Sequence, residues 1–310
     1  MAEKRIVKAK KWVYREIGWY FVRVFLFILR NIPLRHLYVF GEKTIQLAFL
    51  ALKRRRNITM KNLELAFGDD KSEEEILEIY RSTLRNISRG GIELFAYPRF
   101  HDRYFDDMIS IEGKENLDRA LKLGKGVVAV SAHFGNFPFL GMKLAHMGYP
   151  FAVVVRNPRQ EGISRFLQEV RSKAGLESIP DKPARVCVEQ SLKWLKKNGI
   201  LFLQIDLNVI SGGVFVDFFG REVPTFKGPV VMAMRTGASV LPIFIVRENG
   251  DRHRIIIDPP VELELTGDKG KDIFTNLTKL SKVVESYIRK YPDQWWWIHQ
   301  RWRKAKPYEP

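Results

Sequence analysis

Residues 127–147, VVAVSAHFGNFPFLGMKLAHM, read as a buried strand, a short loop and a helix in direct succession. The first five residues are small or β-branched and mostly apolar, which is typical of an interior strand in a parallel sheet. The chain reads as helical from Phe137, and Pro138 fits the first turn because the N–H that proline lacks has no helical partner there. His133 therefore lies in the loop after the carboxyl end of a strand, where open α/β sheets bind their ligands.

The same alternation of strand and helix continues along most of the chain. The predicted strands are 127–131, 151–155, 200–205, 240–246 and 254–258, and the predicted helices are 137–147, 160–174, 184–197, 228–236 and about 271–290. Residues 56–95 also read as helical, and Ser72 with Glu75 forms a capping-box pattern. These patterns predict an α/β fold with a mainly parallel sheet and flanking helices.

The composition is that of a folded protein with an anionic partner. The 310 residues are 45% apolar, which is enough to bury a sizeable core. Cys187 is the single cysteine, so one chain can form neither a disulfide framework nor a cysteine-based metal site. With 52 Lys and Arg against 35 Asp and Glu, the net charge is +17, which points to nucleic acid, acidic lipid or an acidic protein.

Much of this charge lies near the N-terminus. Residues 1–56 hold 14 Lys and Arg against three Glu, a net charge of +11, around the apolar run IGWYFVRVFLFILRNIPL at 17–34. Basic flanks and interfacial aromatic residues favour a membrane contact. Arg23 and Arg30 fall on one helical face, so a helix lying in the interface, a tilted span and a core helix all stay open. We predict a basic membrane-anchoring helical region over 1–56 and a second domain over 57–310.

Polar side chains follow two further predicted strands. Arg156 leaves the strand 151–155 toward the same sheet edge as His133, where its guanidinium could hold a phosphate or carboxylate; a solvated surface arginine is the alternative. Gln204 and Asp206 close the strand 200–205 at that edge, although Asp206 could instead cap a helix or turn. The sequence therefore places several candidate site residues beside His133.

Two aromatic stretches have open interpretations. The segment VFVDFFG follows Gly212-Gly213 and predicts a hairpin or the wall of an apolar pocket, with Phe215 and Phe218 on opposite faces. Ordinary core burial predicts the same pattern. The tail YPDQWWWIHQRWRK, 291–304, could form an interfacial belt, a basic nucleic-acid surface or a buried segment.

Six fragments occur in order along nearly the whole chain. They are RNITMKNLELAFGD (56–69), SAHFGN (131–136), RNPR (156–159), QID (204–206) with GGVFVDFFG (212–220), MRTGASVLP (234–242) and YPDQWWWIHQRW (291–302). Together they resemble the bacterial lipid A biosynthesis acyltransferase family, the late lauroyl and myristoyl transferases, within the lysophospholipid acyltransferase superfamily. Each fragment alone is a weak signal, and the six in this order are a strong one.

The resemblance implies an O-acyltransferase on the cytoplasmic face of the bacterial inner membrane, with 57–310 as the acyltransferase domain. It implies transfer of a fatty acyl chain from acyl carrier protein or coenzyme A to a hydroxyl of a lipid A precursor or related glycolipid. The positive charge suits both an acidic carrier protein and an anionic membrane surface, and we expect no nucleic-acid partner. We also expect no metal and no cofactor, since acyl transfer requires neither. The alternative is a catalytically impaired relative that binds lipid or carrier protein without turnover.

In this chemistry His133 is the expected general base. The expected substrate-binding residues are Asn136, Arg156 for an anionic head group, Gln204, and Gly213, Phe215 and Phe218 in a wall of the acyl pocket.

The chain departs from the family motif at Pro138. The motif has an acid there that orients the histidine ring, and proline cannot accept a hydrogen bond from the ring. Asp206, a backbone carbonyl or the amide of Asn136 could replace that acid. Otherwise the enzyme is slower or altered, or the protein is a non-catalytic relative.

Overall fold

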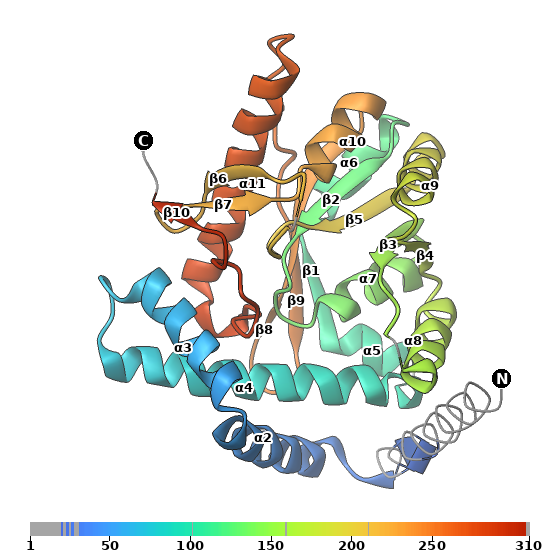
Figure 1. The fold of residues 1–310 in the computed structure, drawn as a ribbon. Helices are drawn as coiled ribbons and strands as arrows, with labels where there is room; N and C mark the ends of the chain where they lie inside the picture. The colour runs from blue at the N-terminus through green and yellow to red at the C-terminus, as the bar shows by residue number, and fades with distance from the viewer. Residues whose placement is uncertain are drawn as a thin grey trace, which may run out of the picture.

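A seven-stranded sheet runs through the centre of the computed structural model (Figure 1), which describes residues 20, 23–24, 26–27, 31–100, 102–158, 160–209 and 211–307. The strands lie in the order β1 (Ile109–Glu112), β9 (His253–Ile257), β8 (Ser239–Arg247), β2 (Val127–Ser131), β5 (Ile200–Gln204), β3 (Phe151–Val155) and β4 (Glu177–Pro180). Every neighbouring pair is parallel except β8 with β9. The predicted α/β fold with a mainly parallel sheet is confirmed.

The two edge strands, β1 and β4, are the part of the sheet that the sequence pattern did not predict. Each is only four residues long and mixes polar with apolar residues, ISIE in β1 and ESIP in β4. An edge strand contacts only one neighbour and packs less apolar surface, so it lacks the apolar run that marks an interior strand.

Helices cover both faces of the sheet. They are α6 (Lys114–Lys122), α7 (Phe137–His146), α8 (Glu161–Lys173), α9 (Ala184–Lys196), α10 (Gly228–Thr236) and α11 (Lys269–Lys290). Alternate residues of β2 point to the two faces. Val128 and Val130 pack with apolar residues of α9, α10 and α11, whereas Val127 and Ala129 pack with those of α6, α7 and α8. The flanking helices are thereby confirmed.

An N-terminal group of helices lies at one end of the sheet (Figure 1). It comprises α2 (Leu34–Ala51), α3 (Lys53–Phe67), the long α4 (Glu73–Ala96), η1 (Tyr97–Arg99) and α5 (Asp102–Met108). The capping box at the start of α4 is confirmed: the Ser72 N–H donates to Glu75 Oε2 at 2.8 Å, and the Glu75 N–H donates to Ser72 Oγ at 3.3 Å. Helix α2 packs along α4, which brings the N-terminal group against the core.

The predicted anchor lies mostly outside the described residues. Of the apolar run 17–34, the structure describes residues 20, 23–24, 26–27 and 31–34. Within the part of the chain that is described, no helix is both long and apolar enough to cross a membrane.

The two aromatic stretches take up distinct structures. Residues 214–225 form the predicted hairpin, with β6 (Val214–Asp217) and β7 (Arg221–Thr225) extended by β10 (Lys306–Pro307). The tail passes through η2 (Pro292–Gln294) and then buries Trp295, Trp297 and Trp302. The burial interpretation of the tail is confirmed for these three rings, and the interpretations that require them at the surface are wrong.

Candidate active site

The parallel pairing of β2 with β5 brings His133 and Asp206 together. Ser131, the last residue of β2, is in register with Gln204, the last residue of β5. His133 and Asp206 each follow two residues later, in loops that leave the same edge of the sheet. Neighbouring parallel strands carry such positions to one place, because their carboxyl ends coincide.

Asp206 makes hydrogen bonds with both the ring and the backbone of His133. Its Oδ1 lies 2.9 Å from His133 Nδ1, and its Oδ2 accepts from the His133 N–H at 2.9 Å and from the Trp295 indole at 2.8 Å. Burial alone would raise the pKa of Asp206, but the charge of His133 and these hydrogen bonds lower it. An ionised carboxylate can only accept, so Nδ1 carries a proton, and in the neutral imidazole the lone pair lies on Nε2.

The loop that carries His133 is held by the aromatic tail and by one glycine. Gly135 has φ +54°, and an added Cβ would overlap the carbonyl oxygen of Ile245. Its N–H donates to the Gln294 carbonyl at 2.8 Å, and the Trp296 N–H donates to the His133 carbonyl at 3.1 Å. The position of the histidine is therefore fixed from two sides.

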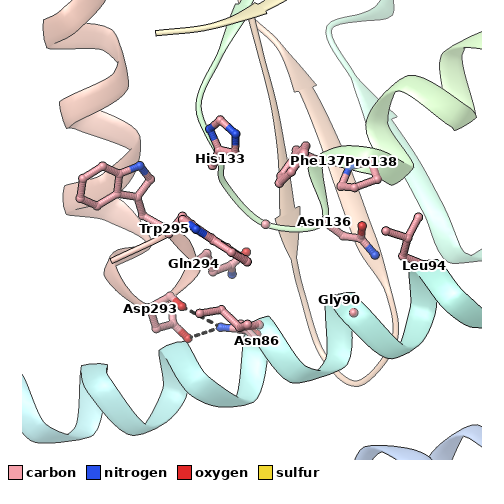
Figure 2. Close-up of a pocket in the computed structure, with 14 residues that line it drawn as sticks. Asn86, Gly90, Leu94, His133, Asn136, Phe137, Pro138, Asp293, Gln294 and Trp295 are labelled. Atoms are coloured by element: carbon pink, nitrogen blue, oxygen red, sulfur yellow. Dashed lines mark hydrogen bonds between the residues drawn. The ribbon is translucent and has the colours of Figure 1, made fainter. Parts of the chain in front are cut away.

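A cavity of about 170 Å³ opens beside the His133 ring (Figure 2). Three segments line it: α4 between Asn86 and Leu94, the loop between His133 and Pro138, and the tail from Asp293 to Trp296. In Figure 2 a hydrogen bond links the first segment to the third, since the amide of Asn86 donates to the Asp293 carboxylate at 2.9 Å. The cavity thus lies among elements far apart in the sequence.

A buried carboxylate, Glu93 of α4, binds Asn136, the residue just before α7. Arg247 binds it in a bidentate fork at 2.6 and 2.7 Å, and the Tyr38 hydroxyl donates at 2.8 Å. Asn136 Nδ2 donates to the same carboxylate at 2.7 Å. Burial opposes the charge, yet His253 and Arg247 lower the pKa of Glu93 to about 2. Because an ionised carboxylate accepts only, this contact fixes which way the Asn136 amide faces.

Replacement of Glu93 by glutamine is expected to lower the free energy of unfolding by about 3–5 kcal/mol, because it leaves Arg247 buried without a countercharge. Urea unfolding followed by circular dichroism measures the loss. Glu42→Gln is the matched control, since Glu42 joins α2 to α4 through the more exposed Arg89 at 2.6 Å; that loss should stay below about 1 kcal/mol. Equal losses in the two variants would contradict the buried role of Glu93.

Two predicted substrate-binding residues lie near the cavity but are held within the protein. Asn136 lines the cavity and is 2% exposed. Gln204 lies one strand away and donates from Nε2 to the Ala132 carbonyl at 2.9 Å. Gln204 thus stabilises the loop that carries His133.

The other predicted binding residues are not brought to the cavity. The guanidinium of Arg156 is 75% exposed and lies on Asp181, with its Nε 2.6 Å from Oδ2. Gly213 and Phe215 belong to the start of the hairpin, and Phe218 is 1% exposed with its ring packed against Trp295. The acyl-pocket wall expected at 213–219 is therefore separate from the cavity beside His133.

The structure also reveals site residues that the sequence reasoning missed. Trp295 donates to Asp206, and Gly90 and Gly91 line the cavity. Glu93 was missed as well, although the sequence carried a signal for it, since it is an acid inside the apolar helical run GGIELF (90–95). No grouping of three His, Cys, Asp or Glu suited to a metal ion occurs among the described residues.

The chain is similar to known bacterial acyltransferases. The chain is 27% identical over 297 residues to the lipid A biosynthesis palmitoleoyltransferase of Escherichia coli, covering 94% of this chain and 92% of that protein. It is 26% identical over 230 residues to the phosphatidylinositol mannoside acyltransferase of Mycolicibacterium smegmatis, covering 73% and 72%.

One solved structure, the 1-acyl-sn-glycerophosphate acyltransferase PlsC of Thermotoga maritima, aligns with 76% of this chain and 97% of its own at 15% identity, with a TM-score of 0.36. The family model for bacterial lipid A biosynthesis acyltransferases matches residues 7–304. The chain belongs to this acyltransferase family.

Proposed function

We propose that this protein transfers a fatty acyl chain from acyl carrier protein or coenzyme A to a hydroxyl of a lipid A precursor or related glycolipid. The observation that carries the proposal is the 2.9 Å contact between His133 Nδ1 and Asp206 Oδ1 beside a cavity. The names of the relatives support a glycolipid acceptor, since they include lipid A and phosphatidylinositol mannoside acyltransferases. The net charge of +17 supports an acidic donor protein.

In the proposed reaction, His133 Nε2 takes the proton of the acceptor hydroxyl as its oxygen attacks the thioester carbonyl. Asp206 holds the ring and stabilises the imidazolium that forms. The tetrahedral intermediate collapses with loss of the thiolate, which takes the proton back from Nε2 and leaves as the free thiol. The first turn of α7 lines the cavity, and its partial positive charge would stabilise the oxyanion.

The test is acyl transfer by the purified full-length protein, with labelled acyl carrier protein or coenzyme A donors and glycolipid acceptors, beside Pro138→Glu. Turnover in the parent supports the proposal, with Asp206 in place of the motif acid. Turnover that occurs in Pro138→Glu but not in the parent would contradict it, and would indicate a binding protein descended from an enzyme.

We further propose that α2 docks on the anionic inner leaflet of the cytoplasmic membrane. Its outward face carries Val39, Phe40, Leu47 and Leu50, which are 55% to 66% exposed. The exposed basic residues 53–56 follow directly at the start of α3. Apolar side chains beside a basic cluster suit the boundary between acyl chains and anionic head groups.

Replacement of both Phe40 and Leu47 by aspartate is expected to weaken binding to anionic vesicles by at least about tenfold, because each side chain loses its burial in the acyl region. Vesicle co-sedimentation at several salt concentrations measures the change. Phe274→Asp is the matched control, since Phe274 is also exposed but lies near the start of α11, at the other end of the molecule from α2 (Figure 1).

Equal weakening in the control would contradict this docking surface. So would a salt-dependent affinity for DNA or RNA above that for vesicles.

A further inference from the structure

Two consecutive glycines, Gly90 and Gly91, occupy the interior of the 24-residue helix α4. Glycine weakens a helix interior, because it loses more backbone freedom on folding than any other residue. Neither position has a backbone that requires glycine, and a Cβ added at either would meet no atom within 4 Å. Other glycines that face open space have positive φ, which explains them; these are Gly124, Gly148, Gly212, Gly220, Gly250 and Gly267. Packing within the described chain therefore gives no reason for this pair.

The pair lies where a ligand would pass. Asn86, Gly90 and Leu94 recur every four residues on the face of α4 toward the His133 loop (Figure 2). Ile87 and Gly91 line the same cavity on the adjoining row. The space above the glycines is thus continuous with the space beside the catalytic histidine.

A second, independent feature of this cavity also points to a ligand. Asn136 lines it and is 2% exposed, and its Oδ1 has no hydrogen-bond partner among the described residues. The amide cannot turn to satisfy this atom, since Nδ2 is held by the ionised Glu93 carboxylate. Buried acceptors are normally paired, so the carbonyl is left for a hydrogen-bond donor that enters the cavity, such as an amide N–H of the pantetheine arm that carries the acyl thioester.

We propose that Gly90 and Gly91 keep open the space that receives a part of the acyl chain of the thioester donor that the shortest chains do not reach, and so help to set which chain lengths are transferred. This inference rests on the proposed function. Ile87 and Leu94 of α4 and Pro138 from the opposite segment line the same cavity, and these apolar side chains suit methylene groups. At about 170 Å³ the cavity holds only part of a long acyl chain, since pockets for drug-sized ligands are about 300–1,000 Å³.

The test compares Gly90→Ala and Gly90→Leu with the parent over short-, medium- and long-chain acyl donors. Gly90→Leu is expected to lower kcat/KM for long-chain donors by about 10- to 200-fold, and to change it for the shortest donors by less than about threefold. Gly90→Ala should give a smaller shift in the same direction. Both variants should keep or raise the Tm, by about 1–3 °C, because alanine and leucine favour the helix. Arg81→Leu is the matched control on an exposed turn of α4 and should leave the donor profile unchanged.

Binding of a non-hydrolysable long-chain acyl-coenzyme A thioether, measured by calorimetry, separates failure of this inference from failure of the proposed function. Weaker binding in Gly90→Leu supports the inference even if the parent shows no turnover, an outcome that would sink the proposed function alone. An active parent whose donor profile and thioether affinity are unchanged in Gly90→Leu would overturn the inference. A loss that is equal for all donors and raises the KM of the acceptor would overturn it too, since the space would then serve the acceptor.

Discussion

Replacement of Asp206 by asparagine is expected to lower kcat for acyl transfer by up to about 10⁴-fold, while the KM of the donor changes by less than about threefold. Asparagine keeps the shape of the side chain, but its NH₂ group can face Nδ1 and favour the wrong ring tautomer. It also removes the charge that stabilises the imidazolium. Steady-state acyl transfer with a labelled donor measures both constants.

Asp181→Asn provides the matched control. Like Asp206, Asp181 follows a strand of the sheet and binds a basic side chain, which is that of Arg156. Neither Asp181 nor Arg156 lines the cavity. We expect its kcat within about twofold of the parent, since a surface pair contributes little. If Asp206→Asn retained full kcat with an unchanged Tm, another group would have to orient His133, and the proposed role of Asp206 would be wrong.

Replacement of His133 by alanine is expected to reduce turnover by at least about 10³-fold, because Nε2 is the proposed acceptor of the hydroxyl proton. The double variant His133→Ala with Asp206→Asn should lose no more than His133→Ala alone. Residues that act as a unit give such non-additive losses. Single-turnover measurements would detect the residual rates.

Additive losses in the double variant would contradict a dyad, and unchanged turnover in His133→Ala would remove the proposed base. Phe137→Leu serves as a control at the neighbouring position. Its ring packs edge-on to His133 with centroids 5.0 Å apart, so it supports the imidazole without sharing its chemistry. We expect a loss of less than about tenfold there, since only part of one apolar contact is removed.

The sequence predicted the strands that carry His133 and Asp206, but not their pairing. Both residues were expected at the same sheet edge, because each follows a predicted strand. Their contact depends on β2 lying directly beside β5, and strand order is not encoded in the pattern of either strand. The aromatic tail was open to three interpretations for the same reason, since its burial depends on where the chain returns.

The ion pair of Arg156 with Asp181 was not predicted, because strand β4 was not predicted. Val155 is in register with Pro180 of β4, so Arg156 and Asp181 leave the sheet side by side. This is the geometry that pairs His133 with Asp206, repeated two strands away with an ion pair as its result. Without β4 in the prediction, Asp181 had no place at that edge and the arginine had no partner.

The roles of Glu93 and Gly90 could not be predicted from the sequence, because they depend on contacts with distant parts of the chain. Helix α4 was expected from its periodicity and its capping box, but the pattern of a helix does not say which of its residues face a ligand. The loop at Gly135 is similar, since its need for glycine comes from the carbonyl of Ile245, which is 110 positions away in the sequence. Local sequence patterns predict local structure, whereas the roles of these residues depend on contacts with residues far away in the sequence.

The tail that packs against the His133 loop is synthesised long after the loop itself, so the candidate site is completed late in protein synthesis. Asp206 receives its indole hydrogen bond from a residue made 89 positions later, and Asn86 meets Asp293 across 207 positions. At about 5–20 residues per second, several seconds separate the synthesis of the dyad from that of the segment that holds it. A ribosome-bound chain that has not yet released Trp295 lacks the donor to Asp206 and one wall of the cavity. The candidate site would therefore be assembled only after Trp295 has left the ribosome, long after the synthesis of His133 and Asp206.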